Sequence, residues 1–276
     1  MECLERILPL LTDIQCITIY TTSSCSVETE KRLLKTLVSD CCNRLRHINW
    51  SIEATNEFAN IIHYLPEFKN LQTLKLVTNH MFYCAIPNPS RYTLEKLELL
   101  HVEFVTTDGS LYMQLFSFFQ LPNISTLILQ GEFYQVTLIS FFIIHSHNLH
   151  YLEIYDCNND ISKLLAQVPD LRGLIIDLQL SNLGALSHST VNRVGVQLQL
   201  KSGRDENKIA RTIVAILNNF SSQVHFPSLR SIVFLDLTRE RFIHILNTRK
   251  SNIIRDSYPS KNFDIFDMSG SILNIT

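Results

Sequence analysis

Glycine is scarce in this chain, with 7 among 276 residues. None of them completes a GxGxxG, GxxxxGK[ST] or GxSxG pattern, which weighs against nucleotide-binding loops and serine-hydrolase turns. The HExxH pattern of zinc proteases and the EF-hand calcium loop are missing as well. The sequence therefore predicts no cofactor, no metal and no catalytic site, and we expect a protein that is not an enzyme.

Clustered positive charge is also missing. The net charge is −2, and the densest basic stretches are Lys31-Arg32, Arg44 to Arg46 and Arg249-Lys250, each of them short. Proteins that bind DNA or RNA neutralise many phosphates and need a broader basic surface than this. We therefore expect no nucleic-acid partner.

The seven cysteines contain no CxxC pair, so a zinc ribbon or a thioredoxin-type site has no support. Buried reduced thiols are typical of the cytosol or nucleus. The most apolar run, Val136 to Ile144, is far shorter than the ~20 residues of a membrane span. Glu2 and Glu5 stand where a signal peptide would be basic. These observations predict a cytoplasmic or nuclear protein that does not associate with membranes.

What the chain does contain is an internal repeat. The segment Leu71 to Asn79 reads LxxLxLxxN, which matches the strand segment of a leucine-rich repeat in full. Leu149 to Cys157 reads LxxLxIxxC, and Asn and Cys are the two residues that such repeats use at this last position. Seven weaker copies have their apolar positions at Ile14-Ile17-Ile19, Leu45-Ile48-Trp50, Leu94-Leu97-Leu99, Ile124-Leu127-Leu129, Leu171-Leu174-Ile176, Val191-Val194-Val196 and Leu229-Ile232-Phe234.

A proline or polar residue precedes the first apolar position of several copies, as in Pro122-Asn123-Ile124, Pro169-Asp170-Leu171 and Pro227-Ser228-Leu229. Proline stops the preceding helix, because its ring and its missing N–H cannot continue the helix. The chain can then turn into a strand. The spacing between copies is irregular, from 20 to 38 residues.

Helical patterns separate the predicted strands. They cover residues 28–41, 55–64, 111–120, 136–145, 161–167, 208–218 and 239–248. Plausible N-caps are Ser26, Thr55, Asp160 and Thr238. Alternation of strand and helix predicts an α/β leucine-rich-repeat solenoid, a horseshoe with parallel strands on its concave side and helices on its convex side. A generic α/β protein with a parallel sheet is the alternative.

We expect the solenoid to span residues 1–250 and residues 251–276 to form a C-terminal tail or cap. Alternate residues of a strand point to opposite faces. The last two apolar residues of each copy should therefore be buried: Leu74, Leu76, Leu97, Leu99, Leu127, Leu129, Leu152, Ile154, Leu174 and Ile176. The residues between and beside them should face the concave side and form the partner-binding surface, with Lys75, Lys96, Glu98, Gln130, Tyr151, Glu153 and Tyr155 as candidates.

The repeats resemble the leucine-rich-repeat region of F-box proteins. The resembling segments are Leu71 to Asn79, Leu149 to Cys157, Leu121 to Ile124 and Phe226 to Leu229. The resemblance implies a monomeric, non-catalytic scaffold that binds another protein, with a role in substrate recognition by a ubiquitin ligase. An F-box itself is not recognisable, because a strand pattern is already present at Ile14. A truncated paralogue without independent function remains an alternative, as does a hydrolase or transferase of α/β type.

Two clusters suggest chemistry of another kind. His145, His147 and His150 lie within six residues and could reach one metal ion, although they straddle a helix end and a strand start. Cys157 lies near His150 and Asp156 in sequence, as a thiol nucleophile would. The repeat pattern favours a buried structural thiol at Cys157 instead, and buried structural thiols are inert.

Overall fold

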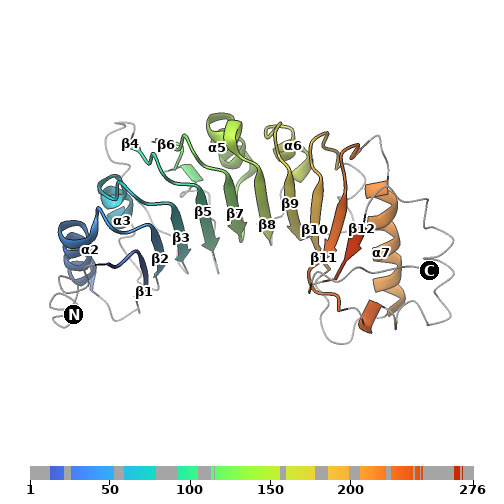
Figure 1. Cartoon of the computed structure of the whole chain (residues 1–276), viewed down its shortest axis with the longest axis horizontal. Coiled ribbons are helices and arrows are strands. Elements are labelled where there is room, and N and C mark those ends of the chain that lie inside the picture. The colour runs from blue at the N-terminus through green and yellow to red at the C-terminus, as the bar shows by residue number, and fades with distance from the viewer. Residues whose placement is uncertain are drawn as a thin grey trace. The chain divides into compact units, whose positions relative to one another are not determined.

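The computed structural model describes residues 13–21, 26–52, 59–78, 92–104, 113–114, 116–155, 160–177, 186–198, 206–221, 225–238, 240–242, 244, 264–267 and 269. Ten strands form one parallel sheet, in the order β1-β2-β3-β5-β7-β8-β9-β10-β11-β12, and helices flank it (Figure 1). The two remaining strands, β4 and β6, pair with each other. The protein is therefore of the α/β class with a large parallel sheet.

The strands of the large sheet are β1 (Cys16–Thr21), β2 (His47–Ile52), β3 (Thr73–Thr78), β5 (Leu99–Phe104), β7 (Thr126–Gln130), β8 (Tyr151–Tyr155), β9 (Gly173–Asp177), β10 (Arg193–Gln197), β11 (Ser231–Phe234) and β12 (Asp264–Phe266). The small pair is β4 (Tyr92–Thr93) and β6 (Phe119–Gln120). The helices are α2 (Val27–Cys41), α3 (Ala59–Tyr64), α5 (Gln135–His145), α6 (Ile161–Leu165) and α7 (Glu206–Ser221), with short 3₁₀ turns η2 (Leu65–Glu67) and η3 (Ser146–Asn148).

The chain divides into two compact units. Unit 1 comprises Met1–Leu149 and Asp156–Asn159, and unit 2 comprises His150–Tyr155 and Asp160–Thr276. Buried and partly exposed side chains alternate along β5, β7 and β8. These strands therefore have one face in the core and one partly exposed face. In β10 and β11, Gly195 and Val233 lie between core residues and are buried as well.

Consecutive copies begin in the same way. In unit 1, the backbone carbonyls of Arg46, Gln72 and Glu98 each accept two successive backbone N–H bonds from the start of the next strand. In unit 2, the carbonyls of His150, Arg172 and Asn192 do the same. All six follow directly on the first apolar residue of a copy. The repeated sequence pattern therefore corresponds to one repeated backbone arrangement.

Side-chain hydrogen bonds also connect consecutive copies just before the strands, and they form a second ladder of bonds beside that of the backbone. The amide Nδ2 of Asn70 donates to the carbonyl of Asn43 at 2.5 Å, and Nδ2 of Asn123 donates to the carbonyl of Glu95 at 2.5 Å. Further bonds of this kind run from Asn148 to Pro122, from Thr190 to Pro169 and from Ser228 to Ser189. These donors immediately precede a copy, and each satisfies a carbonyl of the copy before it. The polar residues at strand starts thus have a bonding role.

The prediction was wrong for one copy. It placed Leu94, Leu97 and Leu99 at the three apolar positions, but β5 begins at Leu99, which is only half-buried, while Leu100 is fully buried. The correct positions are Leu97, Leu100 and Val102, because Leu74 pairs with Leu100 in register. The other nine residues predicted to be buried are buried: Leu74, Leu76, Leu97, Leu127, Leu129, Leu152, Ile154, Leu174 and Ile176.

The error has a physical origin. In three successive copies of unit 1, the position three residues before the copy is also buried, and it is Phe68, Leu94 and Leu121. The carbonyl of each of these residues accepts a bond from the N–H three residues later, which forms the turn into the strand. Leu94 therefore belongs to the turn, although its spacing to Leu97 imitates the start of a copy.

Helix predictions were correct for α2, α5, α6 and α7, apart from their bounds. Ser26 and Asp160 cap α2 and α6, accepting bonds at 3.2 Å from the N–H groups of Thr29 and Ser162. Thr238 Oγ1 accepts a bond from the N–H of Arg241 at 3.3 Å. The predicted cap Thr55 lies outside the described residues.

The helix predicted over residues 111–120 is wrong at its end. Phe119 and Gln120 form β6, which pairs with β4. The Tyr92 and Phe119 rings lie 5.6 Å apart, and the N–H of Leu94 donates to the carbonyl of Gln120 at 3.0 Å. Contacts with a distant strand therefore override the local helical pattern.

The segment 251–276, expected to form a tail or cap, contributes a tenth strand to the sheet. Asp264–Phe266 form β12, which pairs in parallel with β11, and the Ile265 side chain is 1% exposed. Its neighbour in register is Ile232, which is also buried. This segment thus extends the core of unit 2.

Candidate binding surface

An ion pair joins neighbouring strands of unit 1 on the outward face, which is the face of the strands that points away from the core. Lys75 Nζ on β3 lies 3.2 Å from Glu103 Oε2 on β5, and His101 Nε2 lies 3.8 Å from the same oxygen. Burial, and then the charge of Lys75, lower the pKa of His101 to about 4, against the opposing effect of Glu103. His101 is therefore neutral at pH 7, and Glu103 has its partner in Lys75.

The four candidates in unit 1 are placed differently from one another. Lys75 and Gln130 lie on their strands as predicted, both half-buried. Lys96 and Glu98 precede β5 and are exposed, so their predicted position on the strand face is wrong. Lys96 Nζ instead donates to Oδ1 of Asn70 at 2.5 Å. The correction follows from the register of Leu97, Leu100 and Val102, which places His101 and Glu103 on this face instead.

Three candidates converge in unit 2. Tyr151, Glu153 and Tyr155 occupy alternate positions of β8 and are all half-buried. The hydroxyl of Tyr155 donates to Glu153 Oε2 at 2.8 Å. The side chain of Tyr151 also lies close enough to Glu153 to interact with its carboxylate. Burial, and then Glu153, raise the pKa of both tyrosines well above the usual range, so both hydroxyls keep their protons and act as donors.

Two glycines of unit 2 give this face its shape. A β-carbon at Gly173 on β9 would lie 2.4 Å from Cδ2 of Tyr151, and one at Gly195 on β10 would lie 2.8 Å from Cγ1 of Ile175. Real side chains do not approach so closely. The Tyr151 ring and the Ile175 side chain therefore rest on bare backbone of the next strand, which fixes where they lie.

Residues that pair in register on neighbouring strands form rows across the sheet. One row across β8 to β11 contains Glu153, Ile175, Gly195 and Val233. Arg193, on β10, is close enough to Tyr151 to lower its pKa, and Asp177, on β9, is close enough to Tyr155 to raise it. An apolar centre thus lies beside polar groups and aromatic rings, which is typical of protein-binding surfaces.

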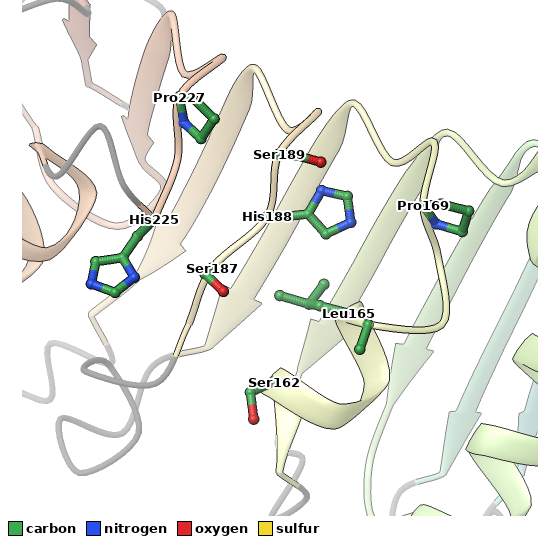
Figure 2. A pocket seen from close by; sticks show the side chains of 9 residues that line it. Ser162, Leu165, Pro169, Ser187, His188, Ser189, His225 and Pro227 are labelled. Atoms are coloured by element: carbon green, nitrogen blue, oxygen red, sulfur yellow. The ribbon is translucent and has the colours of Figure 1, made fainter.

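An open pocket of about 470 Å³ lies in unit 2, away from the strand face. Its polar lining includes Ser162, Ser187, His188, Ser189 and His225, from α6 and from the turns before β10 and β11 (Figure 2). A pocket with serines and histidines raises the question of nucleophilic catalysis.

The contacts of His188 argue against that chemistry. Its Nε2 donates to the carbonyl of Val168 at 2.8 Å, and its Nδ1 lies 3.2 Å from the hydroxyl of Thr190. Burial lowers its pKa, against hydrogen bonds to the backbone of Val168 and Leu165. Both ring nitrogens therefore have structural partners, and the imidazole fills the turn position that apolar residues occupy in other copies.

The three histidines that were considered as a candidate metal site each have other surroundings, beginning with His145. This side chain is buried, and its Nε2 lies 3.3 Å from the carbonyl of Phe116. His147 is exposed in η3, and Nδ1 of His150 lies 3.3 Å from the carbonyl of Asp170. Among the described residues, no three His, Cys, Asp or Glu side chains could together hold a metal ion.

The hypothesis of a thiol nucleophile concerns Cys157 and Asp156, which lie outside the described residues. The same holds for Asn79, the last residue of the clearest repeat copy. No described helix is long and apolar enough to cross a membrane.

Sequence reasoning missed several residues of these surfaces, among them His101, Glu103, Gly173 and Arg193. The spacing of the copies could have revealed the first two. If Leu97 is taken as the first apolar position of its copy, Leu100 becomes the second. The second apolar positions of four successive copies are then Ile48, Leu74, Leu100 and Leu127, at intervals of 26, 26 and 27 residues. The role of Gly173 depends on the neighbouring strand, and no pattern within its own copy indicates it.

Comparisons with known proteins add no relative. No known protein family matches this chain, and no curated protein is similar to it in sequence. The function is therefore inferred from the geometry of the strand faces and of the pocket.

Proposed function

We propose that this protein is a leucine-rich-repeat scaffold that binds another protein through the outward face of β8 to β11. The observation that carries this proposal is the arrangement of Tyr151, Glu153 and Tyr155, in which the Tyr155 hydroxyl donates to the Glu153 carboxylate and Tyr151 lies close to the same group. Such an arrangement orders the side chains before a partner arrives, which reduces the entropy lost on binding. Tyrosine is also enriched among the residues that contribute most to binding.

The repeated bonding at the strand starts supports the repeat assignment. Each copy contributes one strand at nearly constant register, with the same carbonyl accepting two N–H groups. This regularity is expected of a protein built from stacked structural repeats. The resemblance to F-box proteins extends the proposal to substrate recognition in a ubiquitin ligase.

The proposal is tested by affinity capture from cell extract with the full chain as bait. The double variant Tyr151→Ala, Tyr155→Ala removes both rings, while Tyr134→Ala removes a tyrosine that is 66% exposed before α5 and serves as the control. We expect partners that the wild type and the control retain but the double variant loses, with all three chains folded. Capture of a ubiquitin-ligase adaptor among the proteins retained by all three would support the ligase role.

The result that would contradict the proposal is equally specific. If the double variant retains every partner that the wild type retains, the face of β8 to β11 is not the binding surface. Thermal unfolding of the three chains ensures that loss of a partner does not reflect loss of the fold.

A further inference from the structure

We propose that Glu153 binds a lysine or arginine side chain of the partner, and that Tyr151 and Tyr155 hold the carboxylate in place for it. The inference rests on the scaffold function proposed above and specifies the chemistry of the partner. The occupant is thus a basic segment of a protein, bound across β8 and β9.

Glu153 can accept more hydrogen bonds than its neighbours donate to it. A carboxylate offers about four acceptor positions. The hydroxyl of Tyr155 donates to Oε2 at 2.8 Å, and Tyr151 lies close enough to Glu153 to provide at most one further bond. At least half of the capacity remains, and hydroxyl donors orient the group without neutralising its charge. A guanidinium or ammonium group can take the remaining positions.

Two carboxylates of the sheet, Glu103 and Glu153, differ in whether a cation lies beside them. Glu103 of unit 1 has Lys75 Nζ at 3.2 Å. No lysine or arginine nitrogen in the described part of the chain lies within ion-pairing distance of Glu153, although its side chain is half-buried. Partial burial strengthens the attraction of a carboxylate for a cation, because water screens the charge less.

The surroundings of Glu153 also favour a basic ligand. Asp177 lies near Tyr155 and adds a second negative charge, whereas the cation Arg193 lies two strands from β8 and is exposed. An acidic ligand would therefore meet repulsion here. The tyrosine rings attract cations through their π-faces, and Ile175 provides apolar surface for an aliphatic stem.

The test uses short random peptides that are immobilised in pools with one central residue fixed as Lys, Arg, Gln or Glu. Purified full-length chain is passed over each pool, and its retention is measured. We expect about tenfold stronger retention on the Lys and Arg pools than on the Gln pool, which corresponds to ~1.4 kcal/mol. Retention should be weakest on the Glu pool, and added salt should reduce the preference for Lys and Arg.

Matched variants locate the effect. Glu153→Gln keeps the shape of the side chain and accepts hydroxyl bonds, but removes the charge, so the preference should disappear. Glu103→Gln removes a carboxylate that already has an internal partner, so the preference should remain. Tyr151→Phe with Tyr155→Phe keeps both rings and removes the hydroxyls that orient Glu153, so the preference should weaken.

Equal retention on the Lys, Arg and Gln pools would overturn the inference, as would a preference that survives Glu153→Gln. The proposed scaffold function fails separately. If cellular partners are lost on removal of both tyrosine rings but no preference for basic peptides exists, the scaffold function stands and this inference falls. If neither effect is found, both fall.

Discussion

The aromatic ring of Tyr151 lies over the backbone of Gly173 on the neighbouring strand, so closely that a β-carbon there would be 2.4 Å from the ring. Gly173 is also the residue that pairs with Tyr151 in register. The position of a surface tyrosine on β8 is therefore set by a missing side chain on β9. This relationship leads to the first prediction.

Gly173→Ala should displace the Tyr151 ring and move its hydroxyl relative to Glu153. We expect a loss of about 1 kcal/mol in the free energy of unfolding, because the ring can rotate away from the new methyl group at moderate cost. Gly195→Ala creates a similar conflict with Ile175 and is the control, since it should leave Tyr151 in place. Urea unfolding and crystal structures of both variants check this. An unmoved ring in Gly173→Ala would contradict the prediction.

The register of β5 predicts opposite outcomes for two adjacent leucines. Leu100→Ala should lower the free energy of unfolding by about 2–5 kcal/mol, because Leu100 is fully buried in the core. Leu99→Ala should lower it by less than about 1 kcal/mol, because Leu99 lies on the partly exposed face. Chemical unfolding of the two variants measures the difference. Equal losses would show that the strand is placed incorrectly.

The side-chain ladder at the strand starts predicts a cost for losing one of its bonds. Asn123→Ala removes the amide that donates to the carbonyl of Glu95, and should lower the free energy of unfolding by about 1 kcal/mol. Asn192→Ala is a matched control, since within the described residues only the backbone of Asn192 forms hydrogen bonds. Thermal unfolding should show a clear decrease in Tm only for Asn123→Ala. Similar Tm values for both variants would refute a stabilising ladder.

Buried histidines predict that stability decreases in acid. Burial lowers the pKa of His145 to about 4, against the opposing effect of a hydrogen bond to the Phe116 carbonyl. Between pH ~6.5 and ~4 the unfolded chain therefore binds a proton that the folded chain does not, and the free energy of unfolding falls as the pH falls. His145 alone should contribute about 2 kcal/mol of loss between about pH 7 and pH 5. His101 acts in the same direction.

Unfolding in urea at the two pH values measures this effect. His145→Gln should be less stable at neutral pH, because it loses the contact with Phe141, whose ring centroid lies 4.6 Å away. Its stability should nevertheless depend less on pH than that of the wild type. His147→Gln changes an exposed histidine two residues away and should leave the pH dependence unaltered. An unchanged pH dependence in His145→Gln would exclude His145 as the cause.

Alternation of apolar residues within each copy could be predicted from the sequence alone, because it depends on local geometry. Side chains two apart on a strand point to the same face whatever the neighbouring strand is. Leu74 and Leu76, or Leu152 and Ile154, were therefore correctly predicted to be buried. The candidates Tyr151, Glu153 and Tyr155 follow from the same rule, because they alternate with those residues.

The tertiary structure decided which leucines of residues 94–100 belong to the strand, because that choice depends on pairing with β3 and β7. It also decided that Asp264–Phe266 join the sheet, and that Glu103 is paired with Lys75 while Glu153 meets two tyrosines. The support of Tyr151 by Gly173 belongs to the same class. Contacts between strands depend on the lengths of the segments that separate them, and these lengths vary from copy to copy, so the local pattern does not specify which residues meet.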